Sequence, residues 1–292
     1  MANSIELAKK YANMLDEVYA LVSLTSDLDG DPDLVQQGAN ANELIIPKMD
    51  MQGLGDYDRN SGYVKGNVTM TNETVKCNFD RGRKFDVDVM DDVETAGLAF
   101  GRLAGEFERT KVTPELDAFR FATYCGASGI TKKEETFTNG EQVVQALCDA
   151  QAAMDEAEVP SESRYLYITP TLLGMIKALD TTKSREVLDD FAGIKKVPQK
   201  RFYTAIKQLT GKSGEDSGGY SKAEGAADLN FMIIEKSAVI QYPKHVAPKI
   251  IAPENNADSD GYIFGYRHVG IAEVYENKVA GIHASHKPAM GG

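Results

Sequence analysis

The stretch "DYDRNSGYVKGNVTMTNETVKCNFDRGRKFDVDVMDD", residues 56–92, is a long polar ribbon that is rich in β-forming residues. Apolar and polar side chains alternate in two of its segments, 68–79 and 84–89, and this period of two predicts two β-strands. A hairpin of two strands is only marginally stable in water. The ribbon therefore needs cover, either from its own domain or from something outside it, and the pattern leaves both possibilities open.

Amphipathic helices are expected on both sides of this ribbon. Residues 4–24 carry an apolar stripe at helical spacing, on a segment that looks like an arm. The clearest helix covers 91–111, which has acidic residues at its start and basic residues at its end, as the helix dipole favours. Thr113 and Pro114 then either kink this helix or cap a second one through 115–124. A further helix is expected at 139–157.

From residue 164 onward the sequence alternates between strand and helix patterns. "RYLYITP" (164–170) predicts a buried strand, and a helical stretch follows it. A Gly/Ser-rich segment at 210–228 predicts a surface loop. The remaining sequence supplies several strands, and residues 276–278 are expected to form the turn of a late hairpin. The fold class predicted from this mixture is α+β.

The composition limits the range of functions. The chain has 292 residues, with 44 acidic against 32 basic residues and a net charge of −12, which opposes tight sequence-independent binding to nucleic acid. Its three cysteines are widely spaced and odd in number, as expected for reduced thiols and not for a disulfide framework. No apolar run approaches the roughly 20 residues of a membrane span, so we expect no membrane partner.

Motifs for catalysis, metals or cofactors are incomplete. "NADSDG" (256–261) matches the opening of a calcium loop, but Arg267 occupies the position where the bidentate glutamate belongs. His283 and His286 lie three apart in a predicted strand, so they point to opposite faces and are interpreted as surface residues near the end of the chain. We therefore predict that the chain is not an enzyme and has no cofactor. A small-molecule or metal enzyme using the carboxylates at 256–260 is kept as a distant alternative.

Four quoted stretches, in their order along the chain, carry a resemblance to a known family. They are "AKKYANMLDEVYALVSLTSDL", "IPKMDMQGLGDYDRNSGYVKGNVTM" running into "DRGRKFDVDVMDDVET", "AGEFERTKVTPELDAFRFATY" and "YRHVGIAEVYENKVAGIHASHK". With the order of elements, they resemble the major capsid protein of tailed bacteriophages, which has the Hong Kong 97 fold. The resemblance covers nearly the whole chain.

The resemblance implies a division of the chain. Residues 1–42 would form an N-terminal arm, and 43–159 a peripheral domain that contains an extended loop (56–90) and a long spine helix (91–124). Residues 160–262 would form the axial domain, and 263–292 would return to the peripheral domain. The ribbon of the opening would then be the extended loop, covered by a neighbouring subunit.

The function implied is that of a structural capsid subunit. Identical chains would form pentamers and hexamers of an icosahedral shell that encloses double-stranded DNA without binding it specifically. The implied location is the virion, with assembly in the host cytoplasm. Scaffolding would be either a separate protein or a segment that has already been removed, and the first residue, Met1, favours the separate protein. A portal protein is a further expected partner.

Subunit contacts are expected along the extended loop. Charged residues there would form inter-subunit ion pairs, and apolar residues would add contact area. The residues predicted for these contacts are Arg59, Lys65, Met70, Glu73, Val75, Lys76, Phe79, Asp80, Arg81 and Arg83. The alternative within the same architecture is an encapsulin-like nanocompartment, a shell that loads cargo enzymes in place of DNA.

Overall fold

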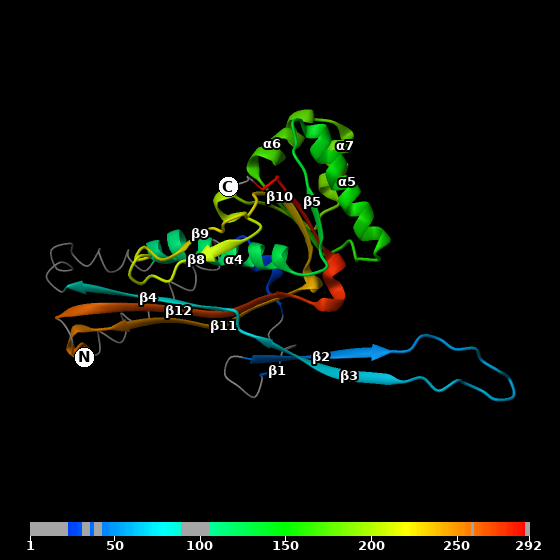
Figure 1. Ribbon diagram of the computed structural model, residues 1–292, viewed down its shortest axis with the longest axis horizontal. Coiled ribbons are helices and arrows are strands. Elements are labelled where there is room, and N and C mark those ends of the chain that lie inside the picture. Colours follow the sequence, from blue (N-terminus) through cyan, green and yellow to red (C-terminus); the bar gives the residue numbers. More distant parts are fainter. Residues whose placement is uncertain (1–22, 31–35, 38–42, 89–104, 258–259, 290–292) are drawn as a thin grey trace.

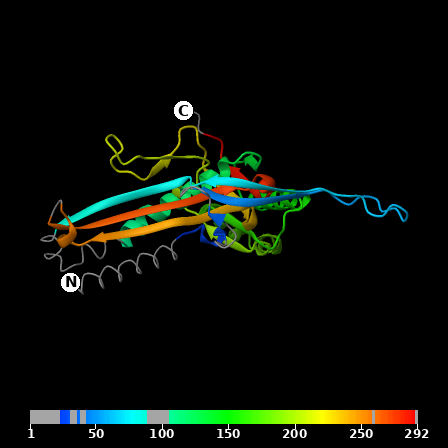
Figure 2. The ribbon, with the colours of Figure 1, turned by 90° about the horizontal axis from the view of Figure 1, so that it is seen from below.

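The molecule is elongated and is built around one long sheet (Figure 1). Its computed structural model describes residues 23–30, 36–37, 43–88, 105–257 and 260–289. A compact α/β unit lies on one side of the long sheet. A β-hairpin extends from the molecule in the direction opposite to that of the long sheet. Seen from below, the long sheet and the hairpin point in opposite directions (Figure 2). The predicted arm helix up to residue 22 and the predicted spine helix up to residue 104 lie outside the described residues.

The α/β unit contains a five-stranded sheet with the order β5-β13-β10-β6-β7. Its strands are β5 (Thr131–Glu134), β6 (Arg164–Ile168), β7 (Gly193–Lys196), β10 (Leu229–Glu235) and β13 (Ile282–His286). The central strand β10 runs antiparallel to both neighbours, whereas β5 and β7 run parallel to theirs at the edges. All of β10 is buried, because its apolar run is covered on both faces of the sheet.

Helices cover the two faces of this sheet. One face packs against α5 (Gly140–Glu156), α6 (Pro170–Leu179) and α7 (Thr182–Asp189). The side chain of Asn139 caps α5 by accepting a hydrogen bond of 2.9 Å from the Gln142 backbone N–H. The opposite face packs against α4 (Thr113–Gly126), where the ring of Phe121 lies 5.1 Å from that of Tyr167.

The long sheet is antiparallel and has the order β11-β12-β4. It consists of β11 (Val239–Ile251), β12 (Gly261–Val274) and β4 (Phe79–Asp88). The predicted alternation in β4 is confirmed for the described side chains: Phe85 and Val87 pack toward Phe264, while Lys84 and Asp86 are exposed. Strand β11 tolerates its two prolines because it lies at the edge of the sheet.

The helix that precedes α4 continues into it without a break. Residues 105–107 are α-helical, Glu108–Val112 form one wide π-helical turn, and α4 begins at Thr113. Pro114 explains the wide turn, because it donates no hydrogen bond and its ring would clash with the carbonyl of Thr110 in a regular α-helix. Of the two predicted alternatives, a local distortion in one helix is therefore the correct one.

The predicted pairing of the ribbon with itself is wrong. Strand β3 (Val68–Lys76) pairs with the earlier strand β2 (Glu43–Met51), and β1 (Gln36–Gln37) adds a short third strand. Between β3 and β4 the chain does not turn back. The side chain of Asn78 donates a hydrogen bond of 2.7 Å to the Ala272 carbonyl and accepts one of 3.1 Å from its N–H, and so continues the pairing with β12. The hairpin is thus 43–76, and β4 belongs to the long sheet.

Helix α5 and strand β13 both pack in the α/β unit, whereas β12 lies in the long sheet. The division into 1–42, 43–159, 160–262 and 263–292 remains a prediction. The expected turn at 276–278 is also wrong, since η7 (Glu276–Gly281) connects two strands of different sheets.

Short elements complete the described chain, which has no helix long and apolar enough to cross a membrane. They are η1 (Ser26–Leu28), η4 (Gln199–Arg201), η5 (Lys236–Ala238), η6 (Pro253–Asn255) and the small pair β8 (Ile206–Gln208) and β9 (Tyr220–Lys222).

Candidate functional site

Large apolar side chains are exposed along one segment of the described chain, the outer part of the hairpin. They are Met49 (61% exposed), Met51 (63%), Leu54 (107%), Tyr57 (62%), Tyr63 (89%), Val64 (69%), Val68 (66%) and Met70 (65%). All of them lie between residues 49 and 70, on an element that extends away from the body (Figure 1). A contiguous apolar surface of this kind marks an interaction site, because water-soluble chains otherwise bury such side chains.

The tip of the hairpin has a defined local structure. The backbones of Asp58 and Gly62 pair through two hydrogen bonds, of 3.3 and 2.7 Å. The Asp58 carboxylate accepts hydrogen bonds from the Asn60 N–H (3.1 Å) and the Ser61 hydroxyl (2.8 Å), and the first of these is the main reason why the pKa of Asp58 is lowered. The rings of Tyr57 and Tyr63 lie 4.9 Å apart beside this turn. The tip therefore presents two tyrosines in a preformed arrangement.

The base of the hairpin is fixed to the body by buried apolar side chains. Val75 is 3% exposed and packs with Ile240, Tyr242 and Ile271. Phe79 is also 3% exposed, and its ring lies 5.0 Å from that of Phe119. Val75 and Phe79 were predicted to contact a neighbouring subunit. The structure corrects this prediction, because both side chains are buried in the core of their own chain.

The charged residues predicted for subunit contacts fall into two groups. Three of them contact their own chain: Asp80 accepts two hydrogen bonds from Arg267 (2.9 and 2.6 Å), Arg81 donates to Glu115 (2.7 Å), and Arg83 donates to the Asp216 carbonyl (2.9 Å). The others lie on the hairpin, where Arg59, Lys65 and Lys76 are exposed with Met70, and Glu73 is half-buried. Contact with a neighbour remains a prediction for this second group.

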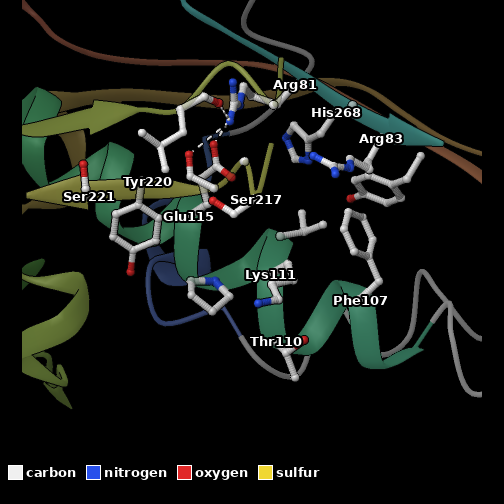
Figure 3. A pocket seen from close by; sticks show the side chains of 18 of the residues that line it. Arg81, Arg83, Phe107, Thr110, Lys111, Glu115, Ser217, Tyr220, Ser221 and His268 are labelled. Carbon is white, nitrogen blue, oxygen red and sulfur yellow. Dashed lines mark hydrogen bonds and ion pairs between the residues drawn. The ribbon is translucent and has the colours of Figure 1, made fainter. Parts of the chain in front are cut away.

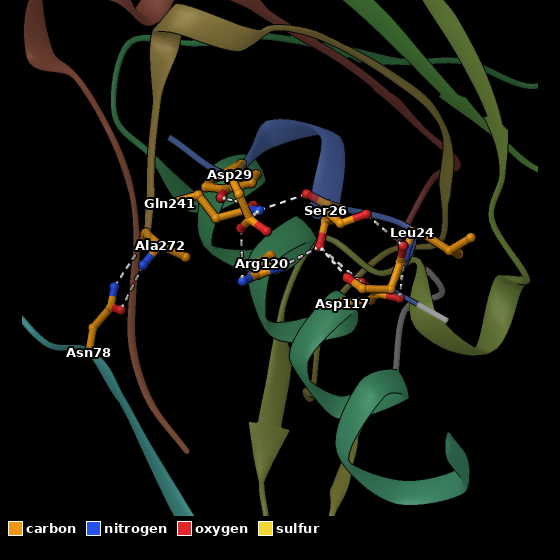
Figure 4. A network of polar contacts seen from close by, with 11 residues as sticks. Leu24, Ser26, Asp29, Asn78, Asp117, Arg120, Gln241 and Ala272 are labelled. Atoms are coloured by element: carbon orange, nitrogen blue, oxygen red, sulfur yellow. Dashed lines mark hydrogen bonds and ion pairs between the residues drawn. The ribbon is translucent and has the colours of Figure 1, made fainter. Parts of the chain in front are cut away.

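A buried polar network fixes residues 23–30 beside the base of the hairpin (Figure 4). The fully buried carboxylate of Asp117 on α4 accepts hydrogen bonds from Ser23, the Leu24 N–H and the Thr25 hydroxyl, at 3.1, 3.2 and 2.9 Å. Arg201 approaches the same carboxylate at 3.1 Å. Burial raises the pKa of Asp117, whereas the charge of Arg120 and these hydrogen bonds oppose the rise.

A second half of the network connects the same segment to the long sheet. The Gln241 amide donates to the Thr25 carbonyl (2.6 Å) and to Asp29 (2.7 Å), and it accepts from the Tyr124 hydroxyl (2.6 Å). Arg120 donates to the Thr25 hydroxyl at 2.8 Å. We did not predict this network from the sequence. The signal that could have indicated it is a charged pair, Asp117 and Arg120, on the apolar face of a helix.

A groove of about 1010 Å³ lies between β4, the helix at 105–115 and the β8–β9 pair (Figure 3). Six basic residues line it: Arg81, Arg83, Lys111, Lys200, Arg201 and Lys222. Only two acidic residues do so, Glu106 and Glu115. The groove is therefore basic, although the whole chain is acidic.

Two arginines of β4 hold the loop that forms one wall of this groove. Arg81 donates to the carbonyls of Leu209 (2.7 Å) and Gly219 (3.2 Å), and Arg83 donates to that of Asp216. Gly218 has a φ of +59°, and a Cβ there would come within 2.9 Å of Arg83. The Gly/Ser-rich loop predicted at 210–228 is thus held against β4 at Asp216 and Gly219.

Histidines and metal-binding residue types give no site in the part of the chain that the structure describes. No group of three or more His, Cys, Asp or Glu residues could hold a metal ion there, and residues 258–259 of the possible calcium turn lie outside it. The interpretation of His283 as a surface residue is wrong: it is 1% exposed and stacks on Phe231. His268 is equally buried, with its ring edge-on to Phe79.

Comparisons of sequence find no relative: neither a family model nor a curated protein matches the chain. Comparisons of structure do find neighbours. A virus-like particle from Pyrococcus furiosus aligns with a TM-score of 0.60 and 13% identity, over 96% of this chain and 99% of its own. The capsid of the cyanophage P-SCSP1u aligns with a TM-score of 0.56 and 12% identity, over 87% and 86% of the two chains. The capsid of the Myoviridae phage XM1 gives 0.54 and 11%, over 91% and 92%.

These alignments span nearly the full length of both chains, so they concern the architecture as a whole. The chain has the α+β fold of phage capsid proteins, the Hong Kong 97 fold, as the resemblance in the sequence predicted. At identities of 11–13% the likeness establishes the fold. Function has to be argued from the surface of this chain.

Proposed function

We propose that this chain is the structural subunit of a closed protein shell, a bacteriophage capsid assembled from many identical copies. The observation that supports this proposal is the apolar outer hairpin, whose side chains at 49–70 are exposed on a chain with a capsid fold. Such an element is stable only when something covers it. A second copy of the chain is the partner that would be present at every hairpin in a shell.

The finer parts of the proposal follow from the resemblance. The copies would form pentamers and hexamers of an icosahedral shell around double-stranded DNA, assembled in the host cytoplasm with separate scaffolding and portal proteins. The net charge of −12 supports this function, because an acidic wall encloses DNA without adhering to it. The remaining predicted contacts, at Arg59, Lys65, Met70, Glu73 and Lys76, would supplement the apolar ones.

A shortened hairpin tests the proposal. Lys48 and Thr71 face each other in the register of β2 and β3, so Met49–Met70 can be replaced by the two-residue turn Asn-Gly without disturbing the base. We expect the parent chain to form closed particles in light scattering and negative-stain microscopy. The shortened variant should keep the circular dichroism spectrum of the body and remain monomeric. Normal particles from the shortened variant would contradict the proposed role of the hairpin.

A nanocompartment that holds protein cargo is the second candidate function. It is favoured by the virus-like particle from Pyrococcus furiosus, which aligns over 96% of this chain. Particles purified from the native source would distinguish the two functions. Nuclease-protected double-stranded DNA inside them supports the phage capsid, whereas a co-purifying enzyme without DNA supports the compartment.

A further inference from the structure

We infer that the basic groove between β4, the helix at 105–115 and the β8–β9 pair binds a small nucleotide, a ligand that joins a planar base to phosphate groups. This inference concerns a ligand and does not depend on the proposed shell function. Three properties of the groove support it: cations without a carboxylate partner, a wall that contains glycines, and half-buried aromatic rings.

The cations of the groove are in excess over its carboxylates. Both carboxylates already have a cationic partner, since Glu115 lies 2.7 Å from Arg81 and Glu106 lies 2.7 Å from Arg109. The exposed cations of the lining that make no ion pair with any residue that the structure describes are Arg83, Lys111 and Lys200. Cationic donors of this kind suit a phosphate group, because charge-assisted hydrogen bonds to its oxygens are the strong ones.

Glycines allow the cation of Arg83 to lie directly against the loop that forms one wall of the groove. Its guanidinium donates a hydrogen bond of 2.9 Å to the Asp216 carbonyl. A Cβ at Gly211 or Gly218 would come within 3.0 or 2.9 Å of the Arg83 Nη1 atom. The loop backbone is therefore bare beside this cation, and no side chain at these glycines obstructs a phosphate that binds there.

Aromatic rings give the same groove a surface for a base. The half-buried rings of Tyr203 and Tyr220 line it. The Tyr220 hydroxyl donates a hydrogen bond of 2.8 Å to the Lys200 carbonyl, and the Lys222 ammonium lies 5.5 Å from the centroid of the Tyr203 ring. These contacts hold both rings in place before a ligand arrives, and proteins bind planar bases by stacking them on such rings.

The combination of cations and aromatic rings selects the class of ligand. An inorganic anion would leave the rings without a partner, an apolar molecule would leave the cations without one, and a nucleotide provides both. A long nucleic-acid strand is disfavoured, because the net charge of −12 repels a polyanion, whereas a small ligand senses mainly the charges within a Debye length of about 8 Å. The groove volume of about 1010 Å³ is at the upper end of the roughly 300–1,000 Å³ that small-ligand sites have.

Variants of the full chain separate the two parts of the site. Lys111→Gln with Lys200→Gln removes two exposed charges of the groove. Tyr220→Leu removes an aromatic ring and keeps an apolar side chain in its place. Lys177→Gln with Lys183→Gln is the matched control, since it removes two exposed charges on α6 and α7, away from the groove. Circular dichroism and thermal unfolding verify that each variant is folded.

Isothermal titration calorimetry with ADP at low salt provides the test, because salt screens the cations of an open groove. We expect one ADP per chain, with a dissociation constant on the order of 10–100 µM. The lysine variant and the tyrosine variant should each bind ADP about tenfold more weakly, and the control should bind it like the parent. Inorganic pyrophosphate should lose affinity only in the lysine variant, and adenosine only in the tyrosine variant.

The outcomes separate the nucleotide site from the shell function. The titrations are repeated with the shortened-hairpin variant, so that the result does not depend on assembly. If ADP shows no saturable binding to either protein, or binds the lysine variant as tightly as the control, the inference is overturned and the shell function is left standing. An octamer of thymidylate that binds more tightly than ADP would overturn the assignment to a small nucleotide. Particle formation, followed by light scattering, tests the shell function separately.

Discussion

Acidification is expected to destabilise this chain through two buried histidines. Burial, together with the charge of Arg120, lowers the pKa of His268 from 6.5 to about 3, and burial together with Lys133 lowers that of His283 to about 4. Near pH 4.5 both imidazoles are therefore neutral in the folded chain, while the unfolded chain binds a proton at each. The stability that these histidines contribute is complete above about pH 6.5 and is lost as the pH falls toward their folded pKa values.

The size of this loss follows from the difference between the folded and unfolded pKa values. A pH of about 4.5 lies roughly two units below the unfolded pKa of histidine, and each unit corresponds to about 1.4 kcal/mol. Each histidine then lowers the free energy of unfolding by about 2.5 kcal/mol. Burial raises the pKa of Glu115, Asp117 and Glu273, and these groups act in the opposite direction. The histidine contribution has to be isolated by substitution.

Urea unfolding of the shortened-hairpin variant, at about pH 7 and about pH 4.5, measures this contribution without interference from assembly. His268→Leu and His283→Leu should each reduce the loss on acidification by about 2.5 kcal/mol, whatever they do to stability at neutral pH. His245→Leu is the matched control, because His245 is exposed and its substitution removes no buried imidazole. If the doubly substituted chain and its parent lost the same free energy of unfolding on acidification, the reasoning would be refuted.

Substitutions at four further positions test the packing around the hairpin. Asp117→Ala should lower the free energy of unfolding by about 3–5 kcal/mol, because it deprives Arg120 of a buried counter-charge, and Asp117→Asn should cost less. Phe79→Ala should cost about 3–5 kcal/mol in urea unfolding, since the ring is fully packed. Met70→Ala, at an exposed position, should change the unassembled chain by less than about 0.5 kcal/mol and reduce the yield of particles. Asn78→Ala should cost about 1–3 kcal/mol and speed amide exchange at the adjoining part of β12.

The fold could be predicted where a pattern is local or where the order of elements is distinctive. The alternation of Phe85 and Val87 with charged residues indicated β4 correctly, and the order of the elements indicated the capsid fold. The partner of β4 could not be predicted, because β12 lies more than 170 residues away along the chain and alternation carries no information about pairing. The same limit produced the error at β3, whose partner β2 precedes the ribbon.

Much of the site depends on contacts between distant segments. The groove is assembled from residues near 81, 111, 200 and 220, and none of these short segments has a motif of its own. The buried network around Asp117 joins residues 23–29 to α4 and β11, so only its two charges on an apolar helix face could have been noticed beforehand. Exposure of the apolar side chains at 49–70 follows from the direction of the hairpin, which a sequence pattern does not contain.

The structure also changes which interactions, ion pairs or apolar contacts, are expected to supply the affinity between subunits. Exposed ion pairs contribute about 0–1 kcal/mol each, and Asp80 and Arg81 already have partners within the chain. A tyrosine or methionine that becomes buried contributes about 1.5–3 kcal/mol, and the outer hairpin offers several such side chains. Apolar contact at the tip should therefore supply most of the affinity, while charge sets the orientation. In the proposed shell every copy would contribute one hairpin, so a modest contact would be repeated many times and the closed assembly would be stable although a single pair is weak.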